Sequence, residues 1–353
     1  MTFEQARAQF PVFERYAYLN AGTNGPLARA TVEAMQEWAR RDLEQGRGGR
    51  PYFERVLPLR RRAREALAGE LGVPVENVAL VSSTTNACNI VLAGLGLAPE
   101  DEVVTTDVEH FGLLGALGAS PAQVRVAAPT PDGILEQLTP RTRLIAISHI
   151  SWMTGNSLRP EEVRRRTDLP ILLDGAQSVG VVDVSAAEFD FYTVSAQKWL
   201  CGPDSTGALY IRDPERLGIA FPSYMSQSEY EPTGAFTPSA GAVRFDSVWF
   251  APGTLAAVVA ALEAAPEWRF ERVRTAAARC RKLLAKRGLE IVTAPDQGGL
   301  VSFRPDGDAA ELVSRLYERD VVVRDVPGKG WLRVSCGWWT SDEDLDRLVA
   351  ALN

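Results

Sequence analysis

Short apolar runs alternate with longer segments of helical periodicity over the first two thirds of the chain. The apolar runs that favour β-strands span residues 78–81, 102–106, 123–127, 143–150, 171–173, 189–194 and 208–211. Helices are expected at residues 2–13, 28–45, 53–71 and 87–95. Short strands that alternate with helices are typical of right-handed βαβ units. The pattern therefore predicts an α/β fold built on a mostly parallel sheet.

The last third of the chain has a different pattern. Helices are expected at residues 255–264, 271–287, 309–319 and 342–352, and strands at 290–293, 299–303, 321–324 and 331–336. This mixture predicts a smaller α+β domain. We expect a large domain at residues 15–248 and a small domain formed by residues 1–14 together with 249–353.

The length, hydrophobic content and net charge of the chain limit the classes of protein to which it can belong. The chain has 353 residues, of which 46% are hydrophobic, so it can bury a full core and exceeds the usual length of one domain. Its net charge is -7, and the arginine cluster at residues 60–64 is expected to be the solvated face of one helix. These features argue against a nucleic-acid or anionic-membrane surface. With no apolar run long enough to span a membrane, the sequence favours a soluble, cytoplasmic protein that binds small molecules.

One carboxylate and one amine stand out at the ends of neighbouring predicted strands. Asp174 follows the apolar run 171–173 and precedes a glycine, while Lys198 follows the run 189–194. The other lysines, Lys282, Lys286 and Lys329, lie on a polar helix face or in a glycine-containing loop. An amine that binds a carbonyl carbon and an acid that keeps a pyridine nitrogen protonated are what a pyridoxal phosphate (PLP) site requires.

Other candidate residues also fall at or near strand ends, where ligands bind in such sheets. Ser83, Thr84 and Thr85 open a helix and can either bind a phosphate or simply cap that helix. His110 can stack on a flat ring or serve as a helix cap or core residue, whereas His149 is expected to be structural.

Two further segments remain open to more than one interpretation. The small-residue loop that begins at Ala21 and Gly22 allows close approach of backbone to a ligand, or is a plain strand-to-helix turn. Arg333 can clamp a substrate carboxylate or form a surface ion pair.

The cysteines and the glycine-rich segments exclude several classes of site. Cys88, Cys201, Cys280 and Cys336 are widely separated and show neither disulfide-framework nor zinc-ligand spacing. No GxGxxG follows the first strand, and no GxxxxGK[ST] motif is present, so a nucleotide-binding α/β protein is disfavoured.

The motifs DGAQSVG and SAQKWLCGPDSTGALYI, supported by SSTTNACN, DVEHFG, SHISWMTGN and LRVSCGWWTSDEDLDRL, carry a family resemblance. The chain resembles the class V aminotransferases, the PLP-dependent fold type I group that includes cysteine desulfurases, C–S lyases and isopenicillin N epimerase-like proteins. The resemblance covers nearly the whole length. It implies a PLP-dependent transferase fold and a homodimer whose sites are completed by the partner chain.

The resemblance also implies roles for individual residues. Lys198 would hold PLP covalently, Asp174 would pair with the pyridine nitrogen, and His110 would stack on the ring. Gln177 would reach the ring hydroxyl and Arg333 would take the substrate carboxylate. The phosphate would be bound by Thr84 or Thr85, Ser195 and Gln197.

Three departures from the desulfurases bear on the reaction. Gln197 replaces a common histidine, and Trp152 replaces an asparagine near the substrate carboxylate. The segment 325–330, DVPGKG, is short and lacks the nucleophilic cysteine of the desulfurase loop.

We therefore expect a β-eliminating C–S lyase that acts on cysteine or a cysteine S-conjugate. The alternatives are a class V aminotransferase or an amino-acid epimerase. An alternative of another class is a non-catalytic sulfur-relay partner in which Cys201 or Cys336 carries sulfur.

Overall fold

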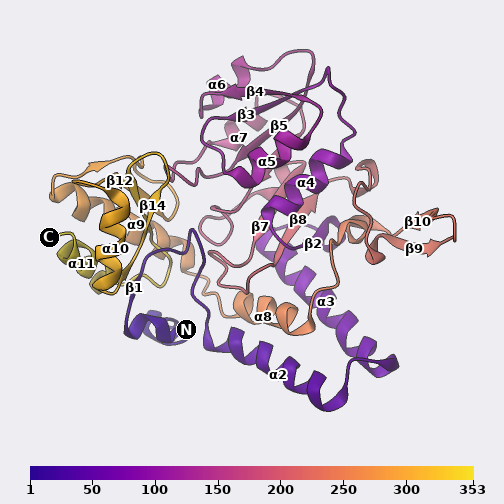
Figure 1. The fold of residues 1–353 in the computed structure, drawn as a ribbon, viewed down its shortest axis with the longest axis horizontal. Helices are drawn as coiled ribbons and strands as arrows, with labels where there is room; N and C mark the ends of the chain where they lie inside the picture. Colours follow the sequence, from indigo (N-terminus) through magenta and orange to yellow (C-terminus); the bar gives the residue numbers. More distant parts are fainter.

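The computed structural model describes residues 1–353 as a larger α/β part joined to a smaller α+β part (Figure 1). A seven-stranded sheet with the order β2-β8-β7-β6-β5-β3-β4 forms the centre of the larger part. Strands β3 to β7 run parallel to one another, whereas β8 is antiparallel to both of its neighbours. The strands are β2 (Val78–Val81), β3 (Glu102–Thr106), β4 (Gln123–Ala127), β5 (Thr142–Ser148), β6 (Ile171–Asp174), β7 (Phe191–Ser195) and β8 (Gly207–Ile211). The predicted, mostly parallel sheet is confirmed.

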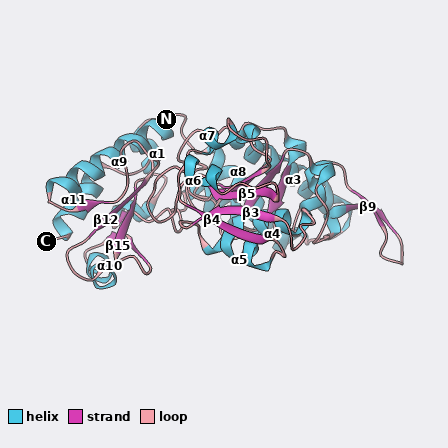
Figure 2. Cartoon of the chain, turned by 90° about the horizontal axis from the view of Figure 1, so that it is seen from above, coloured by secondary structure: helices cyan, strands magenta, loops and turns pink.

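Helices cover both faces of this sheet (Figure 2). In β6, Ile171 and Leu173 belong to one apolar cluster, and Leu172 between them belongs to another. Both faces of the strand are therefore buried, which explains why its sequence is continuously apolar instead of alternating. The helices of this part are α2 (Arg29–Gln45), α3 (Gly49–Leu71), α4 (Thr84–Gly94), α5 (Phe111–Ala119), α6 (Pro131–Glu136), α7 (Pro160–Arg164) and α8 (Pro252–Glu263).

Helix α8 packs against α2 and α3 along the lower edge of the larger part in Figure 1. Its apolar residues Leu255, Val258 and Val259 join the same cluster as the sheet residues Ile171 and Leu173. We therefore propose that the larger part extends through α8, beyond the boundary at 248/249 that the sequence favoured.

The smaller part is an antiparallel sheet, β11-β12-β15-β14, covered by helices. Residues near the N-terminus return to it, because β1 (Ala17–Tyr18) pairs in parallel with β13 (Val321–Val322). The strand expected at 321–324 is divided at Val323, since β13 pairs with β1 and β14 pairs with β15. The remaining elements here are α1 (Phe3–Arg7), α9 (Arg269–Lys286), β11 (Glu290–Ile291), β12 (Leu300–Arg304), α10 (Ala309–Glu318), β14 (Arg324–Val326), β15 (Trp331–Ser335) and α11 (Asp342–Ala351).

Several predicted helix ends shift for identifiable reasons. The first helix ends at Arg7, and a separate 3-10 turn that begins with Pro11 follows it. Helix α3 begins four residues before its predicted start and contains Pro58. Helix α4 begins at Thr84 because the Ser83 hydroxyl accepts a hydrogen bond from the Asn86 N–H and so caps the helix.

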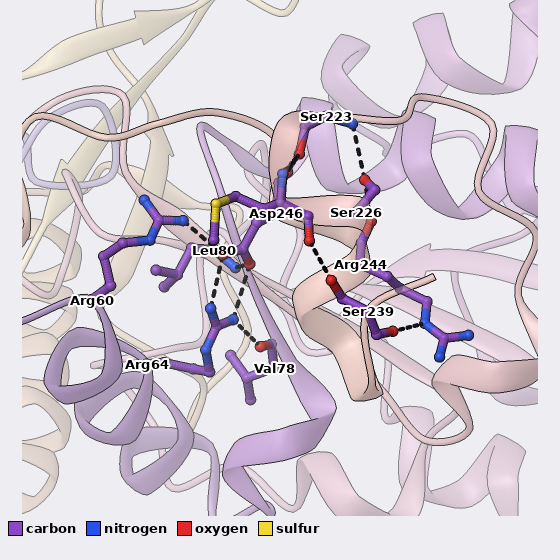
Figure 3. A network of polar contacts seen from close by, with 10 residues as sticks. Arg60, Arg64, Val78, Leu80, Ser223, Ser226, Ser239, Arg244 and Asp246 are labelled. Carbon is purple, nitrogen blue, oxygen red and sulfur yellow. Dashed lines mark hydrogen bonds and ion pairs between the residues drawn. The ribbon is translucent and has the colours of Figure 1, made fainter. Parts of the chain in front are cut away.

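The prediction that the arginine cluster of α3 forms a solvated helix face is wrong for two of its members. Arg61 and Arg62 are largely exposed, but Arg60 and Arg64 are buried and both bind Asp246 (Figure 3). Arg64 makes two hydrogen bonds to the carboxylate, at 2.9 and 2.8 Å, and the Leu80 N–H donates a further one at 2.8 Å.

This buried network fixes the chain segment that precedes α8. The Ser223 hydroxyl donates to the Asp246 carbonyl, and the Ser226 hydroxyl donates to the Arg244 carbonyl. A hairpin, β9 (Gln227–Tyr230) with β10 (Phe236–Pro238), projects from the molecule just beyond these contacts (Figure 1). Asp246 thus anchors the base of the projecting hairpin to α3 and β2.

Candidate active site

Asp174 and Lys198 are delivered to the same edge of the sheet by neighbouring parallel strands. Asp174 is the last residue of β6 and lies opposite Thr193 of β7, and Lys198 follows the end of β7 by three residues. The Asp174 Oδ1 accepts a hydrogen bond from the Ala176 N–H at 2.9 Å and one from Thr193 Oγ1 at 3.4 Å. The carboxylate is buried and forms no ion pair. Its fixed orientation at the strand end suits it to hold a proton on a bound heterocycle.

A pocket of about 240 Å³ opens above this strand edge. It brings together nearly all of the residues that the sequence singled out, from both parts of the chain. Its lining consists of Gly22, Thr23, Ser83, Thr84, Thr85, His110, Trp152, Gln177, Ser195, Gln197, Lys198, Arg324 and Arg333. Asp174 lies beneath, in a small adjoining cavity that also touches His110, Trp152, Gln177 and Lys198. Of the candidate residues only Ala21 is outside both hollows, because it is fully buried in an apolar cluster.

The Lys198 amine is buried near one carboxylate and two guanidinium groups. Withdrawal from bulk water lowers the pKa of Lys198 to about 8, and the charges of Arg333 and Arg324 act in the same direction. Asp174 opposes that effect. Near physiological pH, the amine of Lys198 is therefore more often neutral than the amine of an exposed lysine. A general base, or an amine that binds a carbonyl carbon, has to be neutral.

His110 fills one of the roles that the sequence left open, that of a helix cap, and its stacking on a flat ring stays a prediction. It caps α5, because its Nδ1 accepts a hydrogen bond from the Gly112 N–H at 3.0 Å. Its ring also faces the pocket and lies perpendicular to the Trp152 ring, with the ring centres 5.2 Å apart. Partial burial and the nearby charge of Lys198 lower the pKa of His110, so the ring is neutral at pH 7.

The polar groups expected to bind phosphate all line the pocket. Thr84 and Thr85 form the first turn of α4, where unpaired backbone N–H groups favour an anion. The Ser195 hydroxyl donates to Gln197 Oε1 at 2.9 Å. A Cβ on Gly112 would lie 2.6 Å from Thr85 Oγ1, so glycine at this position allows the start of α5 to lie close to Thr85.

Gln177 is held firmly at the pocket wall. Its Nε2 donates to the Gly22 carbonyl at 2.9 Å, and its Oε1 accepts from Trp199 Nε1 at 3.0 Å. A Cβ on Gly22 would lie 3.0 Å from Arg333 Nη2 and 3.1 Å from Gln177 Oε1, so a side chain there would crowd both groups. Glycine at position 22 thus allows the loop to lie close to these two side chains, and the approach of the loop to a ligand stays a prediction.

The pocket lining also includes two guanidinium groups. Arg333 on β15 is fully buried, and Arg324 lies directly opposite it on β14. Both donate to Thr23 Oγ1, and Arg333 also donates to the Trp152 carbonyl at 2.8 Å. Neither arginine forms an ion pair, and Arg333 Nε is buried without a partner. Burial and the charge of Arg324 lower the pKa of Arg333.

Arg324 and Thr23 were not foreseen as pocket residues. Arg324 becomes a neighbour of Arg333 only through the pairing of β14 with β15, and that register cannot be read from two short runs of sequence. Thr23 lies within the small-residue loop that was already considered for ligand approach.

His149 has a structural place, as expected, although it lies one residue beyond the end of β5. Its Nδ1 is 2.6 Å from the Tyr192 hydroxyl, and the side chain is buried. Burial lowers the pKa of His149 to about 4 despite the carboxylate of Glu161 at 3.6 Å from Nε2.

Comparisons with known proteins place this site in a family. The model of the family described as Aminotransferase class-V matches residues 17–348. The chain belongs to the class V aminotransferase family. It is 30% identical to isopenicillin N epimerase from Streptomyces clavuligerus, with 99% of this chain and 98% of that protein covered. It is 26% identical to a cysteine desulfurase from Cronobacter sakazakii, over 99% of this chain and 97% of the relative.

Solved structures of the cystine C-S lyase C-DES are similar to this class V chain over 98% of its length, at 26% identity. A C-DES mutant with glycine covalently linked to the PLP cofactor has a TM-score of 0.92 and is itself 98% covered. The complex of C-DES with its product cysteine persulfide has a TM-score of 0.90 and is 99% covered. The fold is therefore fold type I, as the resemblance implied, and the chain is a PLP-dependent enzyme.

The side chains in the pocket fit this cofactor. The buried carboxylate of Asp174 forms no ion pair, the amine of Lys198 has a lowered pKa, and the first turn of α4 offers N–H groups to a phosphate.

None of the helices in the structure combines the length and the apolar character that a membrane span needs.

Proposed function

We propose that this class V enzyme is a C–S lyase that eliminates the β-substituent of cysteine or of a cysteine S-conjugate. The observation that supports it is the make-up of the pocket: Lys198 and two unpaired arginines face it, and no cysteine lines it. A lyase needs an amine base and a carboxylate clamp. A desulfurase that transfers sulfur to its own side chain also needs a cysteine within reach.

The same observation disfavours a sulfur-relay role. All four cysteines are buried and unpaired. Burial raises the pKa of the Cys201 thiol, and a hydrogen bond with Cys280 together with burial raises that of Cys336. A thiol that resists ionisation is a poor nucleophile and a poor acceptor of sulfur.

Residues of both parts of the chain would hold the cofactor and substrate. Asp174 would accept a hydrogen bond from the pyridine nitrogen, His110 would lie against the ring, and Gln177 would face the ring hydroxyl. The phosphate would occupy the end of the pocket formed by Thr84, Thr85, Ser195 and Gln197. PLP supplies the electron-withdrawing group that stabilises negative charge at the substrate Cα.

The substrate carboxylate would lie on Arg333, beside the Trp152 carbonyl that fixes this guanidinium. Lys198 would then take the Cα proton, and the C–S bond would break with both electrons leaving on sulfur. The sulfur takes up a proton, and hydrolysis of the three-carbon remainder gives pyruvate and ammonia. Arg324 would contact a second anionic group, such as the distal carboxylate of cystine.

An amino-acid epimerase is the second candidate, favoured by the isopenicillin N epimerase that is similar over almost its whole length. The same residues would serve, since epimerisation differs in that the proton returns to the opposite face of Cα. An aminotransferase would instead move the amino group to a keto acid.

The reactions can be separated by incubating the PLP-loaded enzyme with cystine, cysteine and S-methylcysteine in deuterated water, with and without a keto acid. Stoichiometric pyruvate and a sulfur product from cystine support the lyase. Deuterium at Cα without pyruvate would contradict the lyase proposal and favour the epimerase. Loss of the amino group that depends on the keto acid would contradict it and favour the aminotransferase. Lys198→Ala serves as the control and is expected to abolish each activity.

We also propose that the enzyme is a homodimer, as is usual in this family. Aromatic side chains around the projecting hairpin are exposed, including Tyr224 at 78% and Tyr230 at 71%. Sedimentation of the PLP-loaded protein at twice the chain mass is expected.

A further inference from the structure

A buried carboxylate outside the expected set of site residues connects two strands beneath the pocket. Glu109 follows β3 directly ahead of His110 and is 4% exposed. Its Oε1 accepts a hydrogen bond from Thr106 Oγ1 at 2.5 Å. Its Oε2 accepts from the Ser148 N–H at 2.9 Å and from the Ser148 hydroxyl. Glu109 therefore joins the end of β3 to the end of β5.

These contacts lead directly to the cofactor site. Ser148 lies opposite Asp174 in the parallel pairing of β5 with β6. It also lines the small cavity that contains Asp174, His110 and Lys198. Glu109 binds Ser148 and directly precedes His110 in the chain. Both of these residues line the cavity that contains Asp174.

We propose that Glu109 is a positioning residue of the PLP site, which aligns Ser148 and His110 and places a second negative charge behind Asp174. Two buried carboxylates without an ion-pair partner are costly unless a cation lies close by. The protonated pyridine ring is such a cation. The inference rests on PLP dependence and is independent of which reaction the enzyme performs.

The charges around Glu109 agree with this role. Burial raises the pKa of Glu109 to about 7, and the charge of Asp174 acts in the same direction. The three hydrogen bonds from Ser148 and Thr106 oppose that rise. The charge of Glu109 also contributes to the raised pKa of the Cys88 thiol on α4, for which burial is the main cause. A cation bound above Asp174 would favour the ionised form of Glu109.

Glu109→Gln removes the charge with little change of shape. Its amide oxygen can still accept from Ser148, and its NH₂ group can donate to the Thr106 hydroxyl. Glu102→Gln is the matched control, because Glu102 is also buried and lies at the other end of β3, where it binds Arg141 and Thr139.

The readouts are the dissociation constant of PLP, the pH midpoint of the absorbance change of bound PLP, and the thermal stability of the apoprotein. Glu109→Gln is expected to weaken PLP binding about tenfold and to lower the midpoint by about one pH unit, because a nearby negative charge favours protonated forms. Glu102→Gln should leave both values unchanged. Wild-type PLP affinity and midpoint in Glu109→Gln would overturn the proposal.

Glu109→Asp provides a second test that keeps the charge. Its midpoint should stay near the wild-type value even where the shorter side chain weakens PLP binding. A midpoint that moves as far as in Glu109→Gln would overturn the electrostatic role. None of these measurements uses a substrate, so they are separate from the test of the lyase reaction.

Discussion

Two pairs of arginines differ in what neutralises their charges, and three of the four side chains are buried, while Arg324 is partly buried. Arg60 and Arg64 converge on the buried carboxylate of Asp246, which also accepts a backbone N–H. Arg324 and Arg333 face each other across two strands and share only a threonine hydroxyl. A buried charge without a protein partner has to be compensated from elsewhere. The first pair is thus part of the fold, and we propose that the second binds an anionic ligand.

Removing the carboxylate from the first pair is the strongest test of this contrast. Asp246→Ala leaves two buried guanidinium groups without an acid, which typically costs about 3–5 kcal/mol of stability. Denaturant unfolding of the apoprotein measures the loss. Asp246→Asn keeps the shape and the acceptor for the Leu80 N–H, so a smaller loss is expected. A change below about 1 kcal/mol in both variants would contradict the structural role.

The second pair should respond in the opposite way. Arg333→Met removes a buried charge that has no acidic partner, so the apoprotein should keep its stability. The loss should appear in kcat/KM with cystine, at about 100- to 1,000-fold, because a carboxylate clamp is worth about 3–4 kcal/mol. Unfolding and steady-state kinetics on the same preparation separate the two effects. A destabilised variant with normal kcat/KM would assign Arg333 to the fold instead.

His149 differs from both arginine pairs, because its buried imidazole stays neutral. Its pKa of about 4 in the folded chain is below the ordinary 6.5, so the unfolded chain binds more protons between these values. Its contribution to stability is complete above pH 6.5 and is lost as pH falls toward 4, by about 3 kcal/mol. Unfolding free energies measured at pH 7, 5.5 and 4 test this. His149→Gln should remove that part of the slope, and an unchanged slope would contradict it.

The smallest effect distinguishes the two pocket arginines from each other. Arg324→Gln should lower kcat/KM for cystine about tenfold more than for S-methylcysteine, which has a single carboxylate. The reason is that only cystine offers a second anionic group to Arg324. Equal losses on both substrates would place Arg324 at the same carboxylate as Arg333.

The contrast between the pairs also shows what the sequence could tell. Arg60 and Arg64 are one helical turn apart, so they share a face that Arg61 and Arg62 do not, and this spacing is visible in the sequence. Their partner is 182 residues from Arg64 along the chain, and no local pattern connects them. The solvated-face prediction failed for that reason.

Asp174 and Lys198 were predictable because parallel strands bring their carboxyl ends to one edge, and because the chain has few lysines. Arg324 and Glu109 were not. The position of Arg324 depends on strand register, and that of Glu109 depends on hydrogen bonds to a strand some forty residues later. The strands of the large sheet were predicted well, but the helices α5, α6 and α7 were not foreseen. The division at Val323 required knowledge of which strand each half would pair with.

The position of the arginine pair has a consequence for how this family can diversify. Lys198 and Asp174 belong to the larger part of the chain, whereas Arg324 and Arg333 belong to the antiparallel sheet of the smaller part. On the roles proposed above, the arginines that would bind the substrate carboxylates come from another sheet than the residues that would bind the cofactor. We expect that replacing residues 324–335 with those of a relative changes the substrate preference and leaves the affinity for PLP unchanged.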